Sequence, residues 1–284
     1  MKPFEYFAPT TLAEACALLA RHNGSARMVA GGTDLLLKMK AGRLAPKVIV
    51  NIKRLPDLRG LTQLPVTNYL SIGSLTTLEQ LRLAPLVREH YPALASAAST
   101  MASVQIRNLA TVGGNLCNAA PSADLAPILM ALNATARIVG PGGERRVALD
   151  DFFTGPGATV LTPGELLVSV EVPPPTGFAV YLKHSPRVCM DIAVVGVGLS
   201  LQLNADQCQS ARIVLGAVAP VPLRARRAEA ELTGGPLTPE RLDRVAHSAL
   251  TECQPIDDVR GSAWYRRKMV GVLVRRGLTQ LSWS

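Results

Sequence analysis

The spacing of hydrophobic residues changes several times along the chain, and each spacing predicts an element. Between Leu12 and Leu19 the apolar residues recur every three or four positions, the period of a helix with one buried face. Thr11 is its expected N-cap, and Glu14 stands at the capping-box spacing from it. Short apolar runs predict strands at residues 4–7, 27–30 and 47–52, and a second helix is expected at 33–40. The beginning of the chain therefore forms a small unit of mixed βα type.

The same two periods continue to residue 172, where three consecutive prolines interrupt them. Strands are predicted at residues 69–73, 135–139, 146–149 and 166–172. A capped helix is predicted to start at 76–81, and further helices at 92–103 and 125–132. Proline lacks the backbone N–H that helices and sheets need, so Pro173, Pro174 and Pro175 mark a boundary. We predict a first domain at residues 1–175 and a second at 176–284.

The second part of the chain places its strands before its helices. Three strands are predicted at 178–183, 192–203 and 211–218, followed by helices at 226–232, 239–253 and 262–277. This order is typical of an α+β domain, with an antiparallel sheet and helices on one face. The run Gly196-Val197-Gly198 lies inside the second of these strands and lacks the third glycine of a dinucleotide-binding fingerprint, so we assign it no ligand.

Adjacent glycines occur in two loops. The first loop is Ala30-Gly31-Gly32-Thr33-Asp34-Leu35, and the second begins at Thr111-Val112-Gly113-Gly114-Asn115 and ends at Asp124. Exposed N–H groups of such loops suit phosphate, because glycine lets the backbone approach an anion closely. Either loop alone is more often a tight turn between core elements, and Asp124 also stands at an N-cap position. The pair predicts one ligand with an extended pyrophosphate, held from two sides.

The composition limits the chemistry that this chain carries by itself. Five cysteines are scattered without a C-x-x-C pair, which argues against an iron–sulfur cluster or structural zinc and for reduced thiols: Cys16, Cys117, Cys189, Cys208 and Cys253. The four histidines show no metal-site spacing, and no nucleophile motif occurs. The chain has neither an apolar run of membrane-spanning length nor a signal segment, so we expect a cytoplasmic protein with no membrane span.

The net charge of +9 raises the question of a charged partner. Aromatic residues make up only 4% of the chain and the basic residues are dispersed, so we expect no nucleic-acid binding. The densest basic cluster lies in the last predicted helix and includes Arg260, Arg266, Arg267, Arg275 and Arg276. A solvated helix face is one interpretation of this cluster, and contact with an acidic partner protein is the other.

Four segments together resemble one known family. They are the first glycine loop, the segment from Arg107 to Asn115, the segment Pro121-Ser122-Ala123-Asp124-Leu125-Ala126-Pro127, and the C-terminal stretch from Asp258 to Lys268. In these segments the chain resembles the FAD-binding subunit of the molybdenum hydroxylases, of the xanthine dehydrogenase and carbon monoxide dehydrogenase medium-chain type. The likeness extends over essentially the whole chain.

This resemblance implies an α+β fold with a two-part FAD-binding domain of the vanillyl-alcohol-oxidase (PCMH) type. A small domain of the carbon monoxide dehydrogenase flavoprotein type, with an antiparallel sheet and helices, is expected to follow it. The resemblance also implies which residues contact FAD: Met28, Val29, Ala30, Gly31, Gly32, Thr33, Asp34, Leu35, Met101, Thr111, Val112, Gly113, Gly114, Asn115, Asp124, Leu167 and Lys183. In this set Asp124 is expected to accept a hydrogen bond from a cofactor hydroxyl, and Lys183 to stabilise reduced flavin.

The family implies an oxidoreductase complex in which this chain is the flavoprotein. Electrons pass from a molybdopterin subunit through the [2Fe–2S] clusters of a second subunit to the FAD, and then to NAD, oxygen or a quinone-type acceptor. No catalytic side chain and no metal ligand are expected on this chain, because the cofactor supplies the chemistry. The alternatives are a self-sufficient FAD-dependent oxidoreductase of the same fold and a non-catalytic nucleotide-binding module.

Overall fold

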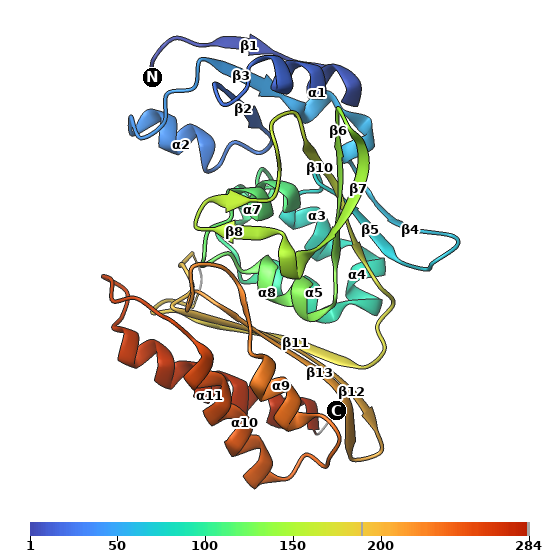
Figure 1. Cartoon of the computed structure of the whole chain (residues 1–284), viewed down its shortest axis with the longest axis vertical. Helices are drawn as coiled ribbons and strands as arrows, with labels where there is room; N and C mark the ends of the chain where they lie inside the picture. Colours follow the sequence, from blue (N-terminus) through green and yellow to red (C-terminus); the bar gives the residue numbers. More distant parts are fainter. Residues whose placement is uncertain (189, 283–284) are drawn as a thin grey trace.

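The computed structural model describes residues 1–188 and 190–282 and stacks them in three parts (Figure 1). A three-stranded unit at the N-terminus lies at one end, a five-stranded sheet with its helices lies in the middle, and a four-stranded sheet with three helices lies at the other end. Cys189 lies outside the described residues, and Cys16, Cys117, Cys208 and Cys253 are free thiols.

The N-terminal unit is a parallel sheet in the order β1 (Glu5–Phe7), β3 (Val48–Asn51), β2 (Ala26–Val29). Helix α1 (Leu12–Arg21) connects its outer strands and is capped by the Thr11 hydroxyl, which accepts the Glu14 N–H at 3.2 Å. The Glu14 carboxylate reaches back to the N–H of Thr10 instead of Thr11, at 3.0 Å. Helix α2 (Leu35–Lys40) begins two residues later than predicted, because the loop at 30–34 continues past the glycines.

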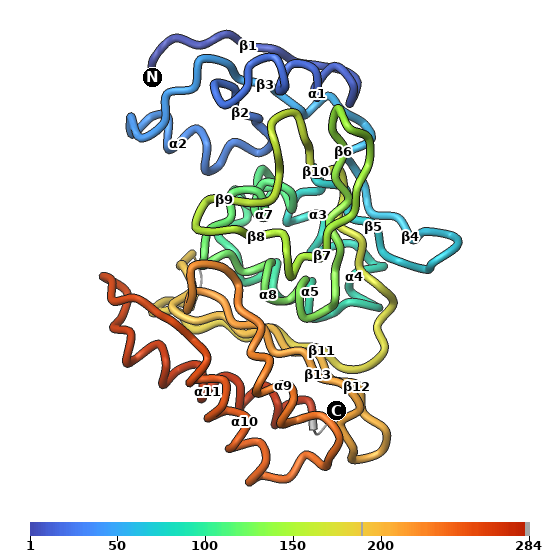
Figure 2. Tube along the Cα trace, in the orientation of Figure 1, coloured from blue at the N-terminus to red at the C-terminus, as the bar shows by residue number. Residues whose placement is uncertain are grey.

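The middle part is an antiparallel sheet in the order β4 (Leu61–Gln63), β5 (Leu70–Gly73), β10 (Leu166–Val172), β6 (Thr135–Gly140), β7 (Gly143–Ala148). The central strand β10 is buried at every position, which explains its continuous apolar character. Short elements connect or flank the sheet: η1 (Ile52–Arg54), η2 (Pro56–Leu58), η3 (Leu149–Asp151), β8 (Phe153–Gly155) and β9 (Ala158–Thr159). Figure 2 shows β8 and β9 beside α7.

Six helices accompany the five-stranded sheet: α3 (Leu78–Leu83), α4 (Pro85–His90), α5 (Pro92–Ser99), α6 (Val104–Arg107), α7 (Val112–Asn118) and α8 (Leu125–Ala131). The predicted capped start near Thr77 is confirmed, since Thr77 and Gln80 form a reciprocal capping box. The helix predicted at 92–103 ends at Ser99, because the chain reverses through Ala102 at a positive φ of 46°. Residues 112–118 were expected in a loop and are helical.

The C-terminal part confirms the predicted antiparallel sheet with helices on one face (Figure 1). Its strands run in the order β11 (Phe178–His184), β12 (Val195–Asn204), β13 (Gln207–Gly216), β14 (Leu223–Arg224). Its helices are α9 (Arg226–Leu232), α10 (Pro239–Glu252) and α11 (Ala263–Ser282), and their apolar sides share one core with β12 and β13. No helix in the described part of the chain is both long and apolar enough to cross a bilayer.

Helix α8 joins the middle and C-terminal parts, because all seven of its residues are buried. The face of the four-stranded sheet that α9, α10 and α11 leave open packs on it. At Gly198 the approach is so close that an added Cβ would lie 2.5 Å from the carbonyl oxygen of Pro127. Gly198 thus serves the packing of a helix against a strand, which agrees with the prediction that this run is no nucleotide fingerprint.

Ion pairs surround this contact. Asp150 accepts from Arg212 at 2.6 Å and from Arg224 at 2.9 Å, so one carboxylate of the middle part binds two guanidinium groups of the C-terminal sheet. Arg212 also donates to the carbonyl oxygen of Met130 at 2.8 Å, at the end of α8. The two parts therefore meet through both apolar packing and paired charges.

The basic cluster of the last helix does not form one exposed face. Arg266 is buried, with 3% of its surface exposed, and donates to the carbonyls of Val194 and Ala217 and to Asp258. Arg275 pairs with Asp243 of α10. The interpretation of these arginines as a common docking surface is therefore wrong for Arg266, which fixes α11 to the sheet.

Candidate functional site

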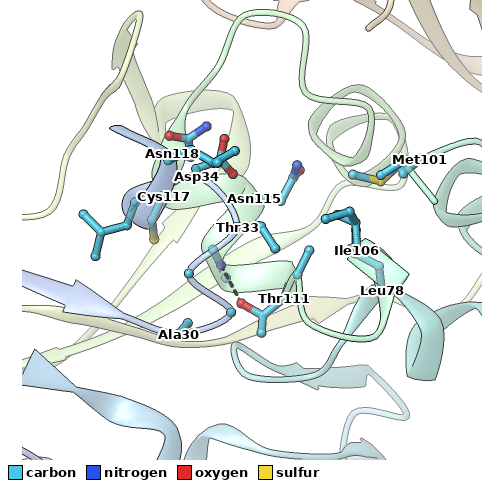
Figure 3. Close-up of a pocket in the computed structure, with 18 of the residues that line it drawn as sticks. Ala30, Thr33, Asp34, Leu78, Met101, Ile106, Thr111, Asn115, Cys117 and Asn118 are labelled. Carbon is cyan, nitrogen blue, oxygen red and sulfur yellow. Dashed lines mark hydrogen bonds between the residues drawn. The ribbon is translucent and has the colours of Figure 1, made fainter. Parts of the chain in front are cut away.

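A cavity of about 690 Å³ opens where the N-terminal unit, the middle part and the segment after β11 meet. Its wall contains the first glycine loop, the start of α7, the turn at 101–103 and the segment 190–192. In Figure 3, Asp34, Cys117 and Asn118 lie toward one end of this wall, and Met101, Ile106 and Leu78 lie toward the other. The cavity volume is in the range of small-molecule and cofactor sites.

The two glycine loops touch each other beside the cavity. A Cβ atom added to Gly31 would overlap the carbonyl oxygen of Leu109, which leads into the second loop. Gly32 has a positive φ of 76°, a conformation that side chains rarely adopt. A Cβ on Gly113 would lie 2.5 Å from Cβ of Ser74 at the end of β5. These glycines are required first by the packing of one loop on the other and on the sheet.

The amide groups of the second loop are used inside the protein. The N–H groups of Val112 and Gly113 donate to the carbonyls of Thr76 and Ser74, each at 2.9 Å. The N–H of Gly114 donates to the Thr111 hydroxyl at 3.0 Å, the dashed line of Figure 3. The expectation of free N–H groups is therefore wrong for residues 112–115, because Thr111 acts as an N-cap and this segment is helical.

The first loop differs in this respect. Within residues 1–188 and 190–282, no acceptor takes a hydrogen bond from the amides of residues 31–34, and the loop borders the cavity. Backbone N–H groups almost always find a partner when they are shielded from water. Four adjacent amides without a partner in the described structure border the cavity, an arrangement that suits an anion.

The second loop contributes a polar side chain in place of its amides. The Oδ1 atom of Asn115 is buried, lines the cavity region and has no hydrogen-bond partner in the described structure. The hydroxyl of Ser74, next to Gly113, is in the same situation. Buried polar atoms without a partner cost roughly 1–3 kcal/mol each. Asn115 therefore fits a ligand that brings hydroxyl or amino donors.

The carboxylate of Asp124 is a buried charged group in the cavity wall. It accepts from the Tyr181 hydroxyl at 2.6 Å and from the Lys183 ammonium at 3.0 Å. Burial raises the pKa of the Asp124 carboxyl, while the charge of Lys183 and the hydrogen bond from Tyr181 lower it. Asp124 stands at the N-cap position of α8 but its side chain makes no capping hydrogen bond and belongs to this buried cluster instead.

Lys183 lies behind Asp124 and is absent from the residues that line the cavity. Its ammonium group donates to Asp124, to the carbonyl of Asp191 at 2.8 Å and to the carbonyl of Thr100 at 3.3 Å. A lysine has three N–H donors, so all of them are occupied. Any effect of Lys183 on a ligand passes through the residues that it holds, and its direct contact with a cofactor stays a prediction.

Arg107 supports the turn that carries Met101 into the cavity wall. It donates to the carbonyl of Met101 at 2.9 Å and pairs with Glu79 of α3 at 2.8 Å. Arg82 also pairs with Glu79, at 2.5 Å. Hydrogen bonds from Arg82 and then from Arg107 lower the pKa of Glu79 to about 2. The cluster ties α3, α6 and the turn after α5 into one support.

This cluster predicts a stability change in acid. Because the pKa of Glu79 in the folded chain lies below its ordinary value of 4.5, the pairs stabilise the fold above that pH and are lost as the pH falls toward 2. We expect Glu79→Gln to melt at a lower temperature than the unmodified chain at pH 6, and the difference to shrink below pH 4.5. Thermal melts at a series of pH values measure it. The exposed Glu89 of α4, changed to Gln, is the control and should leave the curve unaltered.

Fourteen of the seventeen predicted contact residues line the cavity: Met28, Ala30, Gly31, Gly32, Thr33, Asp34, Leu35, Met101, Thr111, Gly113, Gly114, Asn115, Asp124 and Leu167. The other three are Val29, Val112 and Lys183. Val29 and Val112 are 7% and 0% exposed and pack in the core. Val29 directly precedes the first loop and Val112 lies inside the second, so a contiguous motif includes them although their side chains turn inward.

The cavity wall also contains residues outside the seventeen predicted contacts. Lys38 of α2 donates to the Asn118 amide oxygen at 2.7 Å and so links the N-terminal unit to α7. Cys117 is half-buried in the wall, and desolvation raises the pKa of its thiol to about 12. Further wall residues are Ser74, Leu78, Ile106, Ser122, Gly157, Met190, Asp191 and Ile192. Helical spacing from Asn115 and Leu35 could have indicated Asn118 and Lys38, whereas nothing local marks Gly157.

Two family models together match nearly all of the chain. Residues 2–175 match the FAD binding domain in molybdopterin dehydrogenase, and residues 180–281 match the CO dehydrogenase flavoprotein C-terminal domain. The putative xanthine dehydrogenase FAD-binding subunit of Escherichia coli K12 is 36% identical over 278 residues, covering 97% of this chain and 94% of that protein. The carbon monoxide dehydrogenase medium chain of Hydrogenophaga pseudoflava is 34% identical over 278 residues, covering 97% of this chain and 96% of that protein.

Solved structures agree with these matches. A structure of carbon monoxide dehydrogenase from Hydrogenophaga pseudoflava, which lacks the Mo-pyranopterin moiety of the molybdenum cofactor, superposes with a TM-score of 0.95. The two chains are 35% identical, and the match covers 100% of this chain and 99% of that one. The cavity with its free loop amides and unpaired Asn115 fits FAD, whose pyrophosphate and hydroxyl groups supply the missing partners. The chain belongs to the FAD-binding medium-chain family of the molybdopterin dehydrogenases, the flavoprotein subunits of oxidoreductase complexes.

Proposed function

We propose that this chain is the electron-transfer flavoprotein of a heteromeric molybdenum hydroxylase. It receives electrons from the [2Fe–2S] clusters of one partner subunit, after substrate oxidation at the molybdopterin of another, and passes them to an acceptor. The observation that carries the proposal is the row of free amides at residues 31–34, which faces the same cavity as the unpaired oxygen of Asn115. Residues 1–175 form the FAD-binding domain and residues 176–284 the C-terminal domain.

Different parts of the cavity wall bind different parts of FAD. The amides of the first glycine loop bind the pyrophosphate, and Asn115 and Asp124 accept from hydroxyl groups of the cofactor. Leu167 and Met101 supply apolar surface for its ring system. When bound, FAD supplies the redox chemistry, and the chain binds it, orients it and limits the access of water. The acceptor is NAD, oxygen or a quinone-type carrier.

Reconstitution of the purified chain tests this function. The chain incubated with FAD should retain it through gel filtration, turn yellow and pass electrons from reduced flavin to artificial acceptors. It should oxidise no hydroxylase substrate until the iron–sulfur and molybdopterin subunits are added. Substrate oxidation by the metal-free single chain would instead establish a self-sufficient oxidoreductase. A chain that retains no FAD would point to a nucleotide-binding module without redox activity.

A further inference from the structure

The carboxylate of Asp124 is held entirely by the C-terminal domain, although Asp124 itself belongs to the first domain. Both of its oxygen atoms are occupied, one by the Tyr181 hydroxyl at 2.6 Å and the other by Lys183 at 3.0 Å. Both donors come from β11. Residues two apart on a strand point to the same face, so one strand presents both groups to one carboxylate.

The neighbouring strand leaves space for the Tyr181 hydroxyl. A Cβ added to Gly196 of the neighbouring strand β12 would lie 2.7 Å from the Tyr181 hydroxyl, so only glycine leaves the hydroxyl in place. Val180 and Leu182, which alternate with Tyr181 and Lys183 along β11, pack into the other core, against the C-terminal helices. The strand is thereby fixed on its opposite face. Tyr181 is 5% exposed and is absent from the cavity wall, so it reaches the site only through Asp124.

We infer that Tyr181 is a positioning residue for the cofactor: it fixes the Asp124 carboxylate at the cavity wall and so couples the FAD site to β11 of the C-terminal domain. This inference rests on the proposed function. A hydrogen bond to a charged group is stronger than one between neutral groups, and a buried carboxylate that loses one donor turns toward other partners. Because Lys183 already uses all of its donors, it cannot replace the hydroxyl.

The experiment measures FAD binding to the full chain by quenching of flavin fluorescence. We expect Tyr181→Phe to weaken binding roughly tenfold, since one charge-assisted hydrogen bond is worth about that factor. In an Asp124→Asn background the same change should have little further effect, because a residue that acts through Asp124 has nothing left to position. Tyr265→Phe is the matched control, since it removes a hydroxyl hydrogen-bonded to His184 at 2.9 Å in the same domain.

A pH profile separates positioning from a general loss of stability. The titratable groups that face Asp124 are Tyr181 and Lys183, while the Cys117 thiol lines the same cavity and Asp191 meets Lys183 through its backbone carbonyl. The Tyr181 hydrogen bond lowers the pKa of the Asp124 carboxyl against the effect of burial. Without this hydrogen bond, FAD binding should be lost at a higher pH when the solution is acidified. Tyr265→Phe should leave that pH unchanged.

The outcomes are distinct. Gly196→Ala pushes against the Tyr181 hydroxyl from the other side and should weaken FAD binding in the same direction, which provides a second route if Tyr181→Phe folds poorly. If Tyr181→Phe binds FAD with the affinity of the unmodified chain and loses it at the same acid pH, the inference is overturned and the proposed function stays intact. Equal losses from Tyr181→Phe with and without Asp124→Asn also overturn it. Failure of the unmodified chain to bind FAD overturns both.

Discussion

Gly31→Ala is expected to yield a folded chain that binds FAD roughly ten to one hundred times more weakly. The added methyl group overlaps the carbonyl oxygen of Leu109, and one of the two loops must move. The second loop is fixed by the amide hydrogen bonds of α7, whereas the amides of residues 31–34 are free. The first loop therefore moves and carries the proposed pyrophosphate site with it. Overpacking of this kind costs roughly 1–3 kcal/mol, and each 1.4 kcal/mol is tenfold in affinity.

Equilibrium titration with FAD measures this change, and circular dichroism reports whether the fold is retained. Gly142→Ala is the matched control, because a Cβ at Gly142 has no atom within 4 Å and its φ is not positive. The control should bind FAD like the unmodified chain. Unchanged FAD affinity in Gly31→Ala would mean that the amides of the first loop do not bind the pyrophosphate.

Gly198→Ala is expected to destabilise the whole chain by about 3 kcal/mol. Its methyl group would stand 2.5 Å from the carbonyl oxygen of Pro127 and 2.9 Å from the amide nitrogen of Ile128. These are backbone atoms of a helix that is buried throughout, so no flexible side chain can yield. Relief requires α8 and β12 to separate, which opens the apolar contact between the domains.

Urea unfolding of the apo chain measures the loss. Gly155→Ala serves as the control, since a Cβ there meets nothing within 4 Å and the position lies in β8, away from α8. A midpoint for Gly198→Ala within error of the unmodified chain would show that the helix and the strand have more freedom than the structure indicates. A lower urea midpoint with normal FAD affinity would show that the docking of the two domains and the binding of the cofactor are independent.

Elements defined by local signals were predictable from the sequence. Thr11 and Thr77 cap their helices as the spacing indicates, because the capping hydrogen bond joins residues three apart. The antiparallel C-terminal sheet followed from the order of its elements. Residues 112–118 were not predictable in this way, since two glycines disfavour a helix. Hydrogen bonds from this segment to the carbonyls of Ser74 and Thr76, distant in sequence, decide the outcome.

The same division applies to the site. The glycine loops are recognisable from their composition, and fourteen of the residues predicted to contact FAD line the cavity. Met101 and Leu167 came from the resemblance to a family, since no local pattern marks them. The partnership of Asp124 with Tyr181 joins residues 57 positions apart across two domains, and only the folded chain brings them together.

The complete burial of α8 has a consequence for how the protein is made. A ribosome releases the first domain before β12 and β13 exist, and until then the outer side of α8 has no cover. Domains generally fold as units during synthesis, but this one stays incomplete until the C-terminal sheet is in place. Asp124, at the start of α8, acquires its partners Tyr181 and Lys183 at the same stage. If Asp124 binds FAD as proposed, we expect stable cofactor binding only after β11, β12 and β13 have been synthesised.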